Sequence, residues 1–191
     1  MSPGLSPGIL PSVLPSVLPP GRGGDARAFC LAVIAEVYGH AYRAEWHADL
    51  DGLAAGGAAD PYAPERGGGF LVALDGDGAV AATAGFHALA LKTSLAARLS
   101  GRYPDPAGVA QVARVYVRAD RRGAGLGALL HAAVRERAAR AGYRTLYLHA
   151  AAHEAGALAF WRRQGYAAFG AVTYATADGR PEGAVDFDQP A

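Results

Sequence analysis

Apolar residues recur at helical spacing just after Asp25, in the first quarter of the chain. This pattern predicts a helix over residues 26–46 with Asp25 as its N-cap. The stripe expected to be buried consists of Phe29, Val33, Ile34 and Val37. A second, weaker helical pattern covers residues 47–55.

Another amphipathic pattern lies in the second half of the chain, where it occupies residues 125–141 and ends at Gly142. Its apolar positions follow the i, i+3, i+4, i+7 steps of a helix with one buried face. The stripe consists of Leu126, Leu129, Leu130, Ala133, Val134 and Arg137. Shorter helices are predicted over residues 94–102 and over 155–164, the latter closed by Gly165.

Short apolar runs bounded by turn residues predict the strands. The runs 70–74 and 79–86 flank Asp75-Gly76-Asp77-Gly78, a sequence typical of a hairpin turn. Further strands are predicted over 111–117, 145–150, 166–175 and 183–187, the last two joined around Asp178-Gly179. The resulting order ααββ(α)βαβαββ predicts an α/β fold in which helices pack on a mixed sheet.

Residues 1–24 hold half of the prolines and a short Ser-Val-Leu-Pro repeat. Proline removes backbone donors, so neither helix nor strand is expected there. The segment lacks the basic start and unbroken apolar stretch of a signal peptide. We therefore expect a flexible tail over 1–24 and a single domain over 25–191, in keeping with a length of 191 residues.

One cysteine, Cys30, excludes an internal disulfide and a metal site built from cysteines. It lies one turn from Ile34, so a packed thiol is expected, and a reducing cytoplasmic location is the natural interpretation. The apolar stretches fall short of the ~18 residues that a membrane span needs.

Positive and negative charges nearly cancel over the whole chain, but they are unevenly distributed along the sequence. The net charge is +1, which argues against a dedicated nucleic-acid binder. All but one of the basic residues are arginine, the exception being Lys92. The segment 114–163 contains ten arginines and three acids, whereas the remainder is net acidic. This asymmetry suggests that an anionic ligand binds the second half.

A glycine-rich turn joins the predicted strand 111–117 to the helix 125–141. Unpaired amides at a helix N-terminus attract anions, glycine lets the backbone approach closely, and Arg121 and Arg122 add positive charge. Such a turn suits a pyrophosphate. The run 123–128 also fits the dinucleotide pattern G-x-G-x-x-A, but five residues separate it from the strand and the next strand ends without an acid. A turn without a ligand is the other alternative.

The run Arg122-Gly123-Ala124-Gly125-Leu126-Gly127 resembles the [QR]-x-x-G-x-[GA] pyrophosphate loop of the GCN5-related N-acetyltransferases (GNAT). The preceding Arg114-Val115-Tyr116-Val117 is similar to the fourth strand of that family. Residues 157–166 resemble its A-x-x-[LF]-Y-x-x-x-G-[FY] helix. The resemblance covers the chain from about Asp25 to Phe187 and implies a sheet that splays between its fourth and fifth strands.

The resemblance implies that acetyl-CoA is the cosubstrate and that it binds where those strands part. Backbone groups of Val115 and Val117 would pair with the pantetheine, and amides of residues 122–127 would hold the pyrophosphate. The full set of expected cofactor-binding residues is Val115, Tyr116, Val117, Arg122, Gly123, Ala124, Gly125, Leu126, Gly127 and Trp161.

The chain departs from the family at three positions linked to proton transfer. Trp161 replaces a tyrosine acid, Glu154 replaces an asparagine, and Gln111 replaces a glutamate. Two other residues remain as catalytic candidates. His149, at the end of the fifth strand, has the ordinary pKa of a general base, and Tyr116 could donate a proton.

The acceptor side carries weaker signals. His87 ends the third strand and could line the acceptor pocket. The resemblance implies that the end of the first helix borders that pocket, and the polar and aromatic residues there could equally be ordinary surface residues: His40, Tyr42, Glu45, Trp46 and His47. The spacing of His149 and His153, with Glu154 beside them, fits two metal ligands on one helix face, but these residues are predicted at a strand end and in a loop, so no metal site is expected.

The resulting hypothesis is an N-acetyltransferase that moves acetyl from acetyl-CoA to an amine of a small molecule or peptide through a ternary complex. The alternative is an inert CoA-binding regulatory module. A homodimer is compatible with the sequence; nucleic acid and membranes are not expected partners.

Overall fold

A computed structural model describes residues 13–175 and 181–191 of the chain. These residues form one sheet with the strand order β1-β2-β3-β4-β5-β7-β6. Neighbouring strands run antiparallel except β4 and β5, which run parallel. The strands are β1 (Ser16–Val17), β2 (Gly69–Leu74), β3 (Val80–Ala88), β4 (Val109–Val117), β5 (Thr145–Ala151), β6 (Ala167–Ala175) and β7 (Pro181–Pro190).

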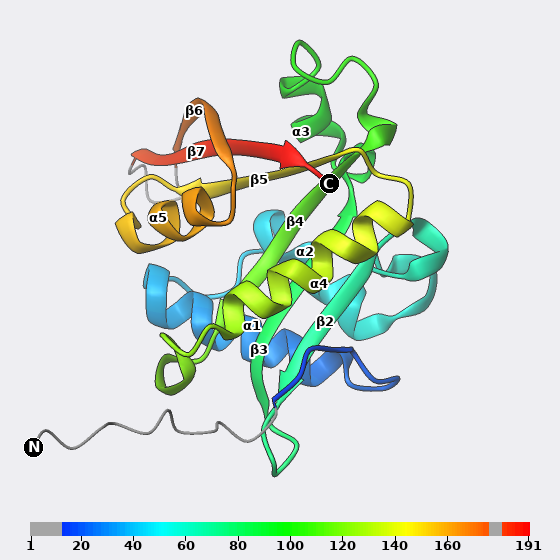
Figure 1. Cartoon of the computed structure of the whole chain (residues 1–191), viewed down its shortest axis with the longest axis vertical. Coiled ribbons are helices and arrows are strands. Elements are labelled where there is room, and N and C mark those ends of the chain that lie inside the picture. The colour runs from blue at the N-terminus through cyan, green and yellow to red at the C-terminus, as the bar shows by residue number, and fades with distance from the viewer. Residues whose placement is uncertain (1–12, 176–180) are drawn as a thin grey trace, which may run out of the picture.

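Helices cover both faces of this sheet. The α-helices in the described part of the chain are α1 (Gly23–Tyr38), α2 (Ala44–Ala55), α3 (Thr93–Arg98), α4 (Leu126–Arg140) and α5 (Ala155–Arg163). Figure 1 shows α4 crossing the front of β2, β3 and β4, with α1 and α2 behind the sheet. Because both faces are covered, β3 is buried along nearly its whole length.

The two faces have separate hydrophobic cores. On the α4 face, Leu130 and Val134 pack in one cluster with Leu146. On the other face, Cys30 and Ile34 of α1 pack with Val72 of β2. The sheet is thus held between two layers, which leaves the ends of the central strands as the places where a ligand can reach the backbone.

The central strands β4 and β5 pair over three residue pairs, from Val109–Thr145 to Gln111–Tyr147. Beyond this point β4 continues on β3 and β5 continues on β7, so the two strands diverge. These observations confirm the predicted α/β class: a mixed, mostly antiparallel sheet, flanked by helices and splayed between β4 and β5.

The first predicted helix is in fact two helices. Gly39 adopts a left-handed conformation (φ 68°) and its N–H bonds to the Ala35 carbonyl, so α1 ends at Tyr38 and α2 begins at Ala44. The prediction of one helix over 26–46 is therefore wrong. The N-cap prediction is wrong too, because the Arg22 carbonyl already accepts a bond from the Ala26 N–H (3.1 Å), which places Asp25 in the first turn.

The buried faces of α1 and α4 differ in part from the predicted stripes. In α1, Ala26 and Cys30 are buried, whereas Phe29 and Val37 are only partly buried. In α4, Leu129 is 51% exposed. His131 takes an inward position instead, because its Nε2 hydrogen-bonds the Tyr166 hydroxyl (3.2 Å).

A strand is present where none was expected. Ser16–Val17 pairs antiparallel with Val72 and Leu71 of β2, so the prediction that 1–24 holds no strand is wrong at these two residues. Proline excludes ladder hydrogen bonds at its own position only, and Ser16 and Val17 lie between Pro15 and Pro19. Residues 1–12 of the predicted tail and the predicted turn at 178–179 lie outside the described residues.

Within the described ranges, no helix combines the length and the apolar character that crossing a membrane requires.

Candidate active site

The glycine loop, residues 122–128, lies between the end of β4 and the first turn of α4. Gly123 (φ 81°) and Gly125 (φ 82°) adopt left-handed conformations that side chains resist, which gives the loop its tight course. In residues 13–175 and 181–191, no protein acceptor is hydrogen-bonded to the backbone N–H groups of residues 123–128. The Arg122 N–H, by contrast, bonds to the Ala119 carbonyl (3.3 Å). Unpaired donors therefore gather at the positive end of the α4 dipole, as an anion site requires.

The arginine side chains around the glycine loop are already paired. Arg122 contacts Glu36 through Nη2 (2.9 Å) and donates from Nε to the Val117 carbonyl (2.9 Å). Arg121 contacts Asp75 (2.8 Å). Acids of the first half of the chain thus offset part of the positive surplus seen in the sequence. The main-chain amides are therefore the principal donors left over for a ligand, although Arg121 Nε also has no hydrogen-bond partner in the described structure.

The exposed edge of β4 leads from the glycine loop towards the point where β4 meets β5. Val115, Tyr116 and Val117 lie beyond the last β4–β5 pair, so in the described structure this edge faces no strand. Arg114 has a φ of 56°, and the pairing of β3 with β4 shifts register between Thr83 and Gly85. This bulge turns the strand away from β5 and widens the opening.

A groove of about 560 Å³ occupies the opening on the α1–α2 side. We call it the β4/β5 groove, since residues of both strands line it. Its lining includes two residues singled out as catalytic candidates, Tyr116 and His149, together with His87. The other lining side chains discussed below are Glu45, Trp46, His47, Asp49, Lys92, Arg98, Gln111, Arg114 and Glu182.

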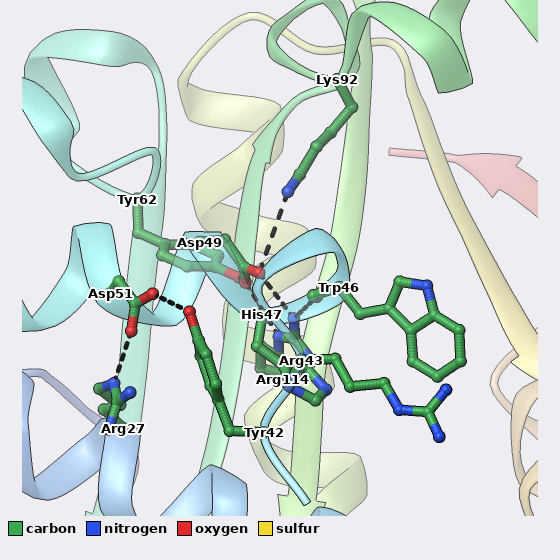
Figure 2. Close-up of polar contacts among 10 residues, drawn as sticks. All are labelled: Arg27, Tyr42, Arg43, Trp46, His47, Asp49, Asp51, Tyr62, Lys92 and Arg114. Atoms are coloured by element: carbon green, nitrogen blue, oxygen red, sulfur yellow. Dashed lines mark hydrogen bonds and ion pairs between the residues drawn. The ribbon is translucent and has the colours of Figure 1, made fainter. Parts of the chain in front are cut away.

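A buried ion pair forms the wall of the groove beneath α2. Arg114 donates to both carboxylate oxygens of Asp49 (2.6 and 2.9 Å) and to the Trp46 carbonyl (2.7 Å). The Tyr62 hydroxyl also donates to Asp49 (2.5 Å), as Figure 2 shows. Burial alone would raise the pKa of Asp49, but the bonds and charge of Arg114 outweigh it and hold that pKa well below its usual range.

Asp49 is not among the site residues predicted from the sequence. The signal was present, because Asp49 adjoins Leu50 and lies one turn before Leu53 on the apolar face of α2. An acid on a buried helix face needs a cation partner, but only the fold shows that this partner is Arg114.

His149 is oriented by a polar network on β5, β7 and α3. The Tyr147 hydroxyl donates to Asp186 (2.6 Å) and lies 3.2 Å from His149 Nδ1. Arg98 donates to Tyr147 and to both oxygens of Asp186. Since the single Tyr147 proton is used on Asp186, His149 Nδ1 is the donor and its Nε2 keeps a free lone pair.

The environment also sets the protonation states of the two catalytic candidates. His149 is reachable from the groove, yet the surrounding protein excludes enough water to lower the pKa of its imidazole. Burial raises the pKa of the Tyr116 hydroxyl. At neutral pH His149 is therefore a neutral acceptor and Tyr116 a protonated donor, as a base and an acid would be.

Gln111 and His87 lie together at the floor of the groove, as cross-strand neighbours of β4 and β3. Gln111 is 7% exposed, and its Oε1 has no hydrogen-bond partner in the described structure. His87 Nδ1 donates to the Ala88 carbonyl (3.0 Å), and burial lowers the pKa of His87 to about 4. Both side chains thus present neutral polar groups where the strands part.

Trp161 and Glu154 lie apart from the groove lining. The Trp161 ring is buried against His131, Phe160 and Tyr166, with ring centroids 4.8 to 5.6 Å away. Glu154 lies beside His153 (3.4 Å) before α5. Across the described ranges, no three His, Cys, Asp or Glu side chains converge as a metal ion would need.

The residues between α1 and α2 form the outer wall of the groove. His40 stacks on His47 (5.6 Å between ring centroids) and meets Trp46 edge-on (5.4 Å). The Arg43 N–H donates to His47 Nδ1 (2.9 Å), so that neutral His47 carries its proton on Nε2. Of the predicted rim residues, His40, Glu45, Trp46 and His47 line the groove, whereas Tyr42 instead contacts Asp51.

Comparison with known proteins places these features in a wider context. A model described as "Acetyltransferase (GNAT) family" matches residues 31–166, which include β4, the glycine loop, α4, β5 and α5. No curated protein sequence matches the chain.

Solved structures show similarity in fold. One is an acetyltransferase of the GNAT family from Streptococcus pneumoniae, with a TM-score of 0.69 and 14% identity over 93% of this chain and 99% of that one. Another is the ribosomal-protein-alanine N-acetyltransferase from Brucella melitensis, with a TM-score of 0.67 and 18% identity over 93% and 99%. A third is a GCN5-related N-acetyltransferase from Kribbella flavida, with a TM-score of 0.64 and 20% identity over 93% and 96%.

Proposed function

Because the chain belongs to the acetyltransferase (GNAT) family, we propose that it moves an acetyl group from acetyl-CoA to an amine of a small molecule or peptide. One observation carries the proposal. The unpaired amides of residues 123–128 lie at the end of the same strand, β4, that parts from β5 beyond Gln111.

The donor end would be bound by the main chain. Amides of Gly123 to Gly127, backed by the α4 dipole, suit the two negative charges of a diphosphate linker. The free edge of β4 at Val115 to Val117 suits the amides of an extended chain, which can add to an edge as a further strand does. The Val117 carbonyl already accepts Arg122 Nε, so its second lone pair is the one left for a ligand.

Acetyl-CoA supplies an activated acyl group whose carbonyl carbon an amine can attack. In that transfer the N–C bond forms, the C–S bond breaks, and the sulfur leaves as a thiolate. The amine must be neutral to attack and loses a further proton afterwards. The side chains facing the groove must therefore accept a proton near the amine and supply one near the sulfur.

We assign the first task to His149 and the second to Tyr116. Nε2 of neutral His149 has a lone pair, because Nδ1 is committed to Tyr147. The Tyr116 hydroxyl keeps its proton at neutral pH, because burial raises its pKa. His149→Gln keeps a polar group of similar reach but removes the base, so kcat at neutral pH should fall by about 100-fold or more.

Calorimetry of the full chain with acetyl-CoA tests the donor site. Saturable binding in the micromolar range is expected, and no binding at high micromolar concentration would overturn the proposal. A panel of amines then tests turnover through release of the CoA thiol. Steady release with any amine supports an enzyme; binding without release from any amine would favour an inert CoA-binding module, the alternative that Gln111 at a family glutamate position suggests.

A further inference from the structure

Two cations, Arg114 and Lys92, lie close to the single buried carboxylate of Asp49. The carboxylate of Asp49 is held by both arms of Arg114 and by the Tyr62 hydroxyl. Lys92, the residue just before α3, approaches the same carboxylate with its Nζ 3.9 Å from Oδ1, and Figure 2 shows this contact. One negative charge therefore serves two positive charges. The Lys92 side chain is 36% exposed, and among the described residues no other acid lies within 4.0 Å of it.

This surplus charge faces the β4/β5 groove rather than bulk solvent alone, since Lys92 is part of its lining. A cation beside a carboxylate that is already satisfied attracts a further anion. Glu45 and Glu182 also line the groove, but neither is paired with Lys92 in the described structure. The missing partner of Lys92 is thus an anionic group of a ligand.

The neighbouring histidines present one donor and one acceptor to the same groove. His47 carries its proton on Nε2, because Nδ1 accepts the Arg43 N–H. His87 carries its proton on Nδ1, which donates to the Ala88 carbonyl, so its Nε2 can only accept. Both rings are neutral at pH 7, because burial lowers the pKa of each to about 4.

Gln111 adds a polar group without a partner. It is buried, Oε1 has no donor in the described structure, and it lies across the strand pair from His87. A buried amide oxygen without a donor is costly, and a ligand N–H in the groove removes that cost. The groove therefore offers positive charge and a donor on the α2–α3 side and neutral acceptors at the floor.

We propose that the acceptor is an amino acid, whose carboxylate binds Lys92 and His47 while its amine lies towards Gln111, His87 and His149. This inference rests on the proposed acetyl transfer and assigns its substrate class. An acceptor with a second cation in place of the carboxylate would face Lys92 and be repelled, which excludes simple diamines as good substrates. The groove volume of about 560 Å³ suits a ligand of this size.

The test compares each common amino acid with its own carboxamide as the acceptor. The full chain is the enzyme, and the CoA thiol released from acetyl-CoA is measured. The two members of a pair share a side chain and differ in the carboxylate. The carboxamide has the less basic amine, so a larger share of it is neutral, and any preference for the acid runs against amine reactivity. For the best pair, kcat/KM should favour the amino acid by about 10- to 100-fold, mainly through KM.

Three variants locate the effect. In Lys92→Met, the kcat/KM for the amino acid and that for its carboxamide should differ by no more than about threefold. The substitution removes the charge and keeps an unbranched apolar side chain of similar length. Lys92→Arg should retain most of the preference. Arg140→Met, which removes an exposed cation paired with Glu136 on α4, should leave the ratio unchanged. Since each ratio is taken on one enzyme preparation, partial unfolding of a variant cancels.

The outcomes separate this inference from the proposed function. Absence of acetyl-CoA binding overturns acetyl transfer itself and this inference with it. Turnover of carboxamides or diamines at rates equal to amino acids, an unchanged ratio in Lys92→Met, or acetyl-CoA binding without acetylation of any amino acid would each overturn the inference and leave acetyl-CoA binding intact.

Discussion

The two ends of the β4/β5 opening are built from different parts of the polypeptide. At the α4 end, the groups without a protein partner in the described structure are main-chain amides of the glycine loop, and the nearby arginine side chains contact Glu36, Asp75 and the Val117 carbonyl. At the α1–α2 end, the groups that face the groove are side chains, and the buried pair of Asp49 and Arg114 forms part of its wall.

This difference predicts which amino-acid substitutions each end of the opening tolerates. A main-chain site depends on backbone conformation and keeps its donors whatever the neighbouring side chains are. A side-chain site depends on a network in which each member orients the next. We therefore expect the donor end to be robust to charge substitutions around it and the acceptor end to be sensitive to single changes in its network.

The largest expected effect comes from breaking the buried pair. Asp49→Asn leaves the Arg114 guanidinium buried without a counter-charge, which should cost about 3 to 5 kcal/mol of unfolding free energy in urea. Asp51→Asn is the matched control, two residues further along α2, where an exposed carboxylate meets Arg27 and Tyr42 (Figure 2). It should change stability little.

If the two ends are independent, Asp49→Asn should also leave the affinity for acetyl-CoA within about twofold below its unfolding temperature. An equal loss of unfolding free energy in Asp49→Asn and Asp51→Asn would show that the pair of Asp49 and Arg114 does not support the groove wall.

A smaller but still large effect is expected at the glycine loop. Gly125→Asp places a carboxylate among the free amides and should weaken acetyl-CoA binding about 100-fold, or about 2.7 kcal/mol. Gly125→Asn has the same shape without the charge and should weaken it far less. Gly78→Asp, at the same φ of 82° in the β2–β3 turn, controls for backbone strain. Calorimetry that found all three alike would contradict an anion site at the loop.

The next largest expected effect is a loss of unfolding free energy at acidic pH, caused by His87 in the β4/β5 groove. Burial lowers the pKa of His87 to about 4, so the unfolded chain binds a proton that the folded chain refuses. Stability should fall as the pH drops from about 6.5 to about 4, by on the order of 2 kcal/mol at pH 5 from this residue. Denaturant unfolding at pH 7 and 5 measures the loss. His87→Asn retains a donor for the Ala88 carbonyl and should show a shallower pH dependence, whereas an unchanged slope would remove His87 as the cause.

The smallest expected effect tests whether Arg122 is held away from the ligand. Glu36→Gln releases Arg122 from its ion pair and should strengthen acetyl-CoA binding about two- to threefold at low salt, the gain shrinking as salt rises. Weaker binding would show instead that Glu36 orders the loop. Val37, the next residue on α1 and only partly buried, supplies a control as Val37→Ala, which should not alter the salt dependence.

The conformation of the glycine loop could be predicted from the sequence because it depends on neighbouring residues, whereas its role in binding acetyl-CoA stays a prediction. Gly123, Gly125 and the first turn of α4 are contiguous, and glycine at those positions reports the backbone conformation directly. Most strands were found for a similar reason, since alternating or continuous apolar runs between turn residues mark them. The same logic failed at α1, where one glycine, Gly39, outweighed a helical pattern that continued past it.

The acceptor end could not be predicted in the same way. Asp49, Lys92 and Asp186 come from three distant segments, and although Asp49 lies on an apolar helix face, the sequence does not show which residues the three contact. Their roles arise from tertiary contacts with Arg114 and Arg98. Trp161, for which the sequence suggested a cofactor contact, lies buried among three aromatic neighbours, and its contact with the cofactor stays a prediction.

The two-residue strand β1 has a consequence for how the protein behaves in solution. It occupies the outer edge of β2, whose amide and carbonyl groups would otherwise be free to recruit a strand from another molecule. Prolines at 15 and 19 bracket the strand, so β1 itself offers no continuous ladder to a newcomer. The part of the predicted tail at Ser16–Val17 thus covers the edge of β2, and removal of the residues before α1 is expected to leave that edge free to pair with a strand of another molecule.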